Sequence, residues 1–129
     1  MSTEGIQYTE SFKAAADLSA KQHYLVKISA ADTVALCADP GDKAIGVLLN
    51  KPAAAGRAAQ VQLRGVAKVV TDGTAGAGIA AGDAVGTDGD GKAIVKSTDK
   101  DRIIGHALEA STADGAIISV LLEPGYLAV

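Results

Sequence analysis

The chain has 129 residues, with 12 lysines and arginines against 15 aspartates and glutamates, for a formal net charge of −3. This acidic balance and the lack of a basic stripe argue against a nucleic-acid partner, and no apolar run approaches the ~18 residues of a membrane helix. With one phenylalanine, three tyrosines and no tryptophan, the core must come from small aliphatic side chains, and so thin a core favours further burial against neighbouring subunits.

The start of the chain predicts an extended arm over residues 1–12, followed by a single β domain over residues 13–129. The arm is polar and β-prone, and Ile6, Tyr8 and Phe12 are spaced along it. Such a segment can order by adding a strand to a neighbouring protein; the alternative is a disordered terminus without a role. It lacks the basic start and apolar run of a signal peptide, so synthesis in a reducing cytoplasm is expected.

A short helix over Ser11–Gln22 is a competing interpretation. The three consecutive alanines favour a helix. The apolar residues of this segment, however, form no continuous helical stripe.

The rest of the chain reads as eight short strands separated by turns rich in Gly, Asp, Pro and Ala. Their spacing of about ten residues predicts an all-β barrel or sandwich. The sequence "TDGDGKAIV" carries the Asp-Gly pair of a tight hairpin, because Gly accepts a positive φ. The expected strands are His23–Ile28, Thr33–Ala38, Ala44–Asn50, Ala59–Thr71, Asp83–Thr87, Lys92–Lys96, Ile103–Glu109 and Ala116–Leu122.

The chain contains an internal repeat, about 18–63 and 79–122. A shift of 59 residues places Ala44–Leu63 on Ile103–Leu122 without a gap, and seven of the twenty positions are identical, including the Ile-Gly pair at the start. Upstream, "LSAKQ" matches "IAAGD" at a shift of 61, and the hairpins are expected to absorb the difference. We therefore predict two similar β half-units that cover each other about an approximate twofold axis as halves of one small barrel; the rival explanation is chance similarity.

No residue pattern indicates catalysis, a cofactor or a metal site, so the chain is predicted not to be an enzyme. Cys37 is the only cysteine, which rules out an internal disulfide, and a buried inert thiol is expected. His106 replaces Val47 in the repeat, and a histidine among apolar neighbours is typical of a packed or interface position. Asp83, Asp88 and Asp90 lie near one hairpin without the spacing of a calcium loop.

The order of these features resembles the head-decoration proteins of tailed phages, also called capsid cement proteins. The matching stretches are "GIQYTESFKAAADLSA", "AIGVLLNKPAAAGRAAQVQLRGVAKV", "GIAAGDAVGTDGDGKAIV" and "IIGHALEASTADGAIISVLL". The resemblance covers nearly the whole chain, but its motifs are Gly/Ala turns and aliphatic strands.

This resemblance implies a structural virion protein, commonly a homotrimer, on the outer surface of a phage head. It would bridge subunits of the major capsid protein and carry no catalytic residues, and it would be made in the host cytoplasm. The arm residues expected to contact the capsid are Ile6, Gln7, Tyr8 and Phe12. Possible contacts between subunits are His106 and the apolar tail residues Tyr126 and Leu127, although the tail could equally pack on its own domain.

Two other functions remain as alternatives. "IAAGDAV" resembles the Gly-Asp turn of lipoyl and biotinyl carrier domains, which are also duplicated, but the only lysine in the middle of the chain is Lys68, inside an expected strand rather than at a hairpin tip. A small-barrel hydrolase would need convergent polar groups, and the sequence nominates no such trio.

Overall fold

The structure is a computed structural model that describes residues 7–74 and 78–128. Nine strands and no helix occur in these residues, so the predicted all-β class is confirmed and nothing in them could cross a membrane as a helix. The eight expected strands all form, with ends shifted by a few residues. The strands are β1 Gln7–Ala14, β2 Leu25–Ala30, β3 Thr33–Leu36, β4 Ala44–Leu48, β5 Ala58–Asp72, β6 Ala84–Thr87, β7 Ala93–Val95, β8 Arg102–Ala107 and β9 Asp114–Tyr126.

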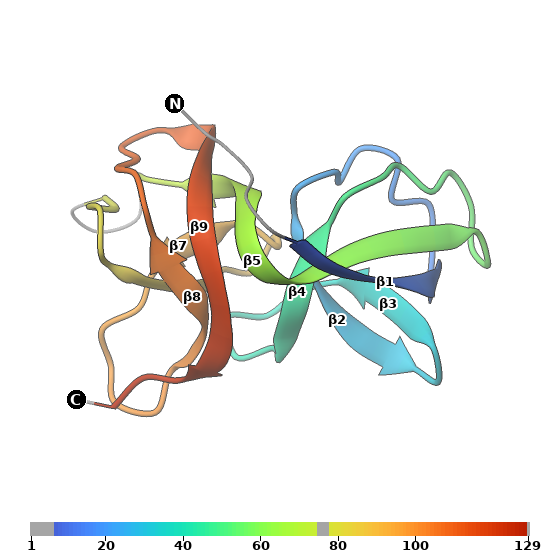
Figure 1. Cartoon of the computed structure of the whole chain (residues 1–129), viewed down its shortest axis with the longest axis horizontal. Coiled ribbons are helices and arrows are strands. Elements are labelled where there is room, and N and C mark those ends of the chain that lie inside the picture. The colour runs from blue at the N-terminus through green and yellow to red at the C-terminus, as the bar shows by residue number, and fades with distance from the viewer. Residues whose placement is uncertain (1–6, 75–77, 129) are drawn as a thin grey trace.

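The strands form two closed barrels that share β5. The sheet order is β1-β3-β2-β4-β5-β7-β6-β8-β9, and the additional pairings β1–β5 and β5–β9 close a five-stranded ring on each side of β5. We call β1-β3-β2-β4-β5 the first barrel and β5-β7-β6-β8-β9 the second barrel. Figure 1 shows them as two lobes, with the first on the right and the second on the left.

The strand pairings confirm the internal repeat. Every pairing that joins β2, β3, β4 and the first half of β5 has a counterpart 59 residues later. Examples are Leu25↔Val47 with Ala84↔His106, Val26↔Leu36 with Val85↔Val95, and Val47↔Gln62 with His106↔Leu121. The two half-units therefore share one topology and one register.

β1 is the counterpart of the second half of β5. It pairs antiparallel with β5 through partners such as Glu10↔Val61, as the second half of β5 pairs with β9 at Ala67↔Val120. The described part of the predicted arm, residues 7–12, thus lies in a strand that completes the first barrel. No helix forms over Ser11–Gln22, where β1 ends and bends and turns follow.

Three details of the predicted arrangement need correction. Each half-unit closes on itself rather than both closing one barrel, because β1 and β9 each return to β5. The hairpins keep the shift of 59, and the two-residue slip lies further upstream: Leu18 N–H donates to Pro52 and Ile79 N–H to Ser111, a shift of 61 against 59. The third correction, to the twofold axis, follows from the contact between the barrels.

That contact runs in one direction. The β6–β7 hairpin of the second barrel reaches the first barrel, where Leu25 N–H donates to the Gly91 carbonyl at 2.8 Å. Under a twofold axis the counterpart, Asp32 on the β2–β3 hairpin, would reach the second barrel in the same way. Asp32 is instead exposed, and its carbonyl accepts from Lys13 of its own barrel. The half-units are therefore arranged head to tail.

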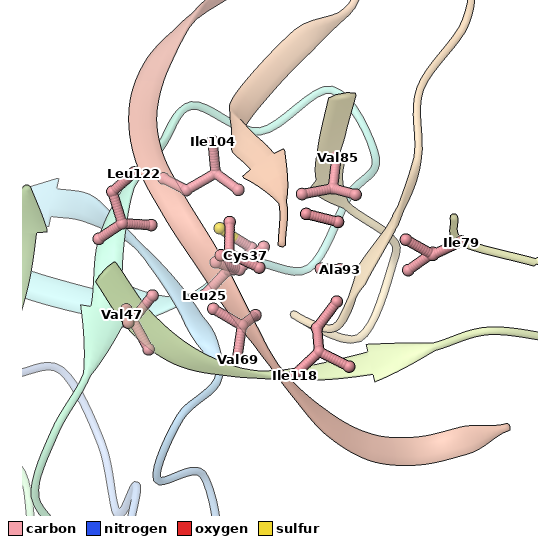
Figure 2. Close-up of a cluster of buried hydrophobic side chains, with 13 residues drawn as sticks. Leu25, Cys37, Val47, Val69, Ile79, Val85, Ala93, Ile104, Ile118 and Leu122 are labelled. Atoms are coloured by element: carbon pink, nitrogen blue, oxygen red, sulfur yellow. The ribbon is translucent and has the colours of Figure 1, made fainter. Parts of the chain in front are cut away.

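The core has two parts. The first barrel encloses seven buried residues, which are Ala14, Leu18, Val26, Val34, Leu48, Ala59 and Val61. The larger cluster fills the second barrel and continues onto the outside of the first, where Leu25, Cys37 and Val47 join it (Figure 2). Alternation along each strand explains this, since Val26 points into the first barrel and Leu25 points to the junction.

Glycines are required where strands approach most closely. A Cβ on Gly46 would collide with the carbonyl oxygen of Gln62, and one on Gly105 with that of Leu121. These are counterpart positions, so the repeated Ile-Gly pair marks the same close approach in both barrels. Gly65, with φ 96°, lies where β5 passes from its pairing with β1 to its pairing with β9.

Replacing Gly105 with alanine should destabilise the protein by about 3 kcal/mol or more, because the new methyl group overlaps backbone that cannot move without breaking the β8–β9 pairing. The measurement is the free energy of unfolding in denaturant. Gly125→Ala is the control, since nothing lies within 4 Å of its Cβ position, and it should change stability by less than about 0.5 kcal/mol. Equal stabilities of the two variants would contradict the assignment.

Candidate partner-binding site

The most extensive apolar hollow among the described residues is an open groove of about 640 Å³ between the two barrels. Residues from β1, β2, β4 and β5 of the first barrel line it together with the starts of β8 and the end of β9 from the second. We call it the inter-barrel groove, and its lining residues are Tyr8, Phe12, Ile28, Lys43, Ala44, Ile45, Leu63, Arg64, Arg102, Pro124 and Gly125. A small cavity of about 40 Å³ adjoins it and shares four of these residues.

The floor of the groove is the outer layer of the first core. Phe12, Ile45 and Leu63 are partly buried and pack against that core, so the groove presents apolar surface on a rigid support. Tyr8 stands at its edge with 55% of its surface exposed, and its hydroxyl donates to Glu10 Oε1 at 3.2 Å. A concave apolar surface with few polar groups is typical of a binding site.

Three cations surround this apolar floor. No carboxylate forms a salt bridge with Lys43, Arg64 or Arg102 within residues 7–74 and 78–128. Arg64 Nη1 donates to the Leu63 carbonyl at 2.8 Å. The Arg102 guanidinium donates to the Tyr126 hydroxyl and lies 4.3 Å from the centre of that ring. The groove is thus locally positive although the chain is acidic, which suits a partner with apolar and acidic side chains.

The structure brings together some of the predicted contact residues. Tyr8 and Phe12 lie in the groove, and Tyr126 adjoins it through Arg102. Gln7 begins β1, whereas Ile6 lies outside the described residues. Leu127 exchanges backbone hydrogen bonds with Lys100 and Asp101, so the described part of the tail is held by its own chain.

His106 lies apart from the groove, on the outer face of β8. Its side chain is 44% exposed, and Nδ1 is 3.9 Å from Glu123 Oε1. Its counterpart Val47 is fully buried at the barrel junction. The site that sequence reasoning missed is the set of groove cations, although the repeat held a signal: Lys43 and Arg102 are counterparts at the shift of 59.

The described residues offer little reactive chemistry. No group of three His, Cys, Asp or Glu side chains is placed to hold a metal within the described ranges. The aspartates near the second hairpin serve its turns, since Asp88 Oδ1 accepts from the amides of Asp90 and Lys92 and Asp83 Oδ2 from that of Ala80. Lys68 lies inside β5 opposite Ser119, not at a hairpin tip as a carrier domain requires.

Comparison with known proteins identifies the family. Residues 3–122 match the family described as phage cement protein. The chain belongs to the phage cement protein family. The solved structure of the N base of head fiber gp8.5 of bacteriophage phi29 is similar, with a TM-score of 0.66 and 18% identity, covering 96% of this chain and 100% of that chain. At that identity the likeness shows a common fold, and no curated protein matches the chain.

This phage cement protein is therefore a structural protein associated with the phage capsid, as the sequence resemblance implied. Its groove and its exposed strand faces are features of a protein that works by contact. Its thiol is correspondingly withdrawn, because burial at the barrel junction raises the pKa of Cys37 to about 12.

Cys37 should react with a thiol reagent at pH 8 roughly a thousandfold more slowly in the folded protein than in denaturant, because only the thiolate attacks. Absorbance from a chromogenic disulfide reagent measures the rate. The same sample in denaturant is the control and should react at the rate of a free cysteine. A native rate close to the denatured one would show that the junction opens or that the thiol is exposed.

Proposed function

We propose that this protein binds the outer surface of a phage head and stabilises the capsid lattice by bridging subunits of the major capsid protein. The family match over residues 3–122 is the observation that carries this proposal. A protein that binds the assembled lattice and not the separate subunits stabilises the lattice by mass action. Many copies on one shell add their contacts through multivalency.

The inter-barrel groove is the proposed capsid contact. Tyr8 and Phe12 supply aromatic surface, and aromatic residues and arginine are the commonest residues to dominate binding energy. The unpaired cations Lys43 and Arg64 at the groove select a segment with acidic side chains. We therefore propose an extended segment of the capsid protein, carrying apolar and acidic residues, as the occupant.

The edge of β1 supports a contribution from backbone hydrogen bonds. Within the described residues, β1 pairs with β3 only at Lys13 and Ala14, although β1 is paired along its other edge with β5 from Gln7 to Lys13. The edge over residues 7–12 is therefore open to an added strand. In this proposal Ile6, Gln7, Tyr8 and Phe12 contact the capsid protein through β1.

We further propose that the protein acts as a homotrimer, with His106, Tyr126 and Leu127 near contacts between copies. The small aliphatic core, whose largest fully buried side chains are Leu, Ile and Gln, is consistent with additional burial between subunits. Three copies around one axis would place three grooves on the shell, so that one trimer reaches several capsid subunits.

The test uses heads of the phage that encodes this chain, prepared without the protein. The purified protein should bind them and raise their melting temperature. Arg64→Glu and Tyr8→Ala should each weaken binding by about tenfold or more, through a repelled carboxylate and a lost aromatic contact respectively. Sedimentation of heads with increasing protein measures the bound fraction.

Lys51→Glu is the matched control, because Lys51 is exposed outside the groove and the charge change equals that of Arg64→Glu. It should bind as the unaltered protein does. Binding that survives both groove substitutions would show that another surface contacts the capsid. Failure of the unaltered protein to bind heads would overturn the proposed function itself.

A further inference from the structure

The second barrel presents an uncovered copy of a surface that is covered in the first. Val47 and Gln62 pair at the barrel junction and are both 0% exposed. Their counterparts, His106 and Leu121, pair in the same way on the second barrel. There the His106 side chain is 44% exposed and Leu121 is 36% exposed. This outward face, which includes Ala84 and Val95, we call the receiving face.

The first barrel carries the matching hairpin. The hairpin that covers the first barrel is β6–β7, in which Thr87 is 2% exposed. The counterpart of Thr87 in the β2–β3 hairpin is Ile28, an apolar residue that is 47% exposed. A β-hairpin of the kind that fits this surface is therefore exposed at one end of the molecule, while the receiving face is exposed on the other barrel.

We propose that copies of this protein associate head to tail, with the β2–β3 hairpin of one copy seated on the receiving face of the next. Each contact would repeat the contact that already joins the two barrels within the chain. The occupant of the receiving face is thus a second copy. This inference deepens the proposed homotrimer, but its contacts form without a capsid.

The differences in side-chain size between the counterparts are complementary. At the internal contact, a Cβ on Gly91 would lie 2.5 Å from Leu36 Cδ1, so the hairpin tip has no room for a side chain. At the proposed contact the tip residue is Asp32, which is larger. The residues that receive it are smaller, because Val95 takes the place of Leu36 and Ala84 that of Leu25. The larger tip therefore meets the roomier face.

Charge on the two surfaces is also complementary. Asp32 brings a carboxylate to a face that contains His106 and has Lys96 next to Val95. Lys96 is the counterpart of Cys37, which contacts Thr87 at the internal junction. The proposed contact therefore places Ile28 on the aliphatic stem of Lys96, whose Nζ donates to the Pro40 carbonyl at 3.2 Å, and stems of this kind pack well on apolar side chains.

The geometry of such a contact fixes the kind of assembly. Head-to-tail contacts use two different surfaces, so they produce a ring when the rotation between copies closes and a chain when it does not. A ring of three satisfies both surfaces of every copy. The solution mass should then be about three times the 12.8 kDa of one chain.

The first experiment measures molar mass by sedimentation in the absence of capsid. The unaltered protein should be an oligomer, and Leu121→Asp and His106→Asp should each raise the dissociation constant at least about tenfold, towards the monomer. Ile117→Asp is the matched control: Ile117 is exposed on the same strand, and its counterpart Ala58 is exposed in the first barrel, so the contact does not cover that position. A monomeric unaltered protein, or variants that assemble normally, would overturn the proposal.

The second experiment tests the register by disulfide cross-linking. Asp32→Cys combined with Val95→Cys should yield covalent oligomers on oxidation, because the counterpart positions Gly91 and Leu36 are in contact. Each single variant is a control, and Cys37 contributes no background because burial suppresses its reactivity. An assembled double variant that forms no cross-link would exclude this contact. Oligomers that form and cross-link but do not bind heads would overturn the proposed function alone.

Discussion

The whole structure depends on one continuous strand that serves two barrels. β5 is 15 residues long, and its first half hydrogen-bonds with β1 and β4 while its second half pairs with β9 and β7. The conformational freedom of glycine at Gly65 lets the strand change direction between the two sets of partners. Because every other strand is placed by its pairing to β5 or to a neighbour of β5, the groove between the barrels is a direct product of this bend.

The local signals in the sequence were sufficient for the elements but not for their closure. Aliphatic alternation and turn residues located eight strands, and the shift of 59 predicted counterpart pairs such as Val47↔Gln62 and His106↔Leu121. Whether two half-units close one barrel or two depends on where β1 and β9 pair. That choice is a long-range one, which alternation along a strand does not encode.

The candidate site shows the same division. Tyr8 and Phe12 were predicted as contact residues from the resemblance and their positions in the arm, and both line the groove. The strand β1 that carries them is polar, so its role as a barrel strand could be recognised only from its pairing with β5. Arg64 and Arg102 come from different barrels, and no sequence pattern announces that tertiary folding brings them to one apolar floor.

The two barrels also compare the same backbone written with different residues. Positive φ angles occur at His23 and Gly82 and at Asp32 and Gly91, each pair 59 residues apart. The left-handed conformation is thus a property of the fold, and the second barrel meets it with glycine where the first holds a side chain in a less favourable state. One half of the molecule is consequently a template for engineering the other: exchanging residues between counterpart positions relieves local strain without altering the path of the chain.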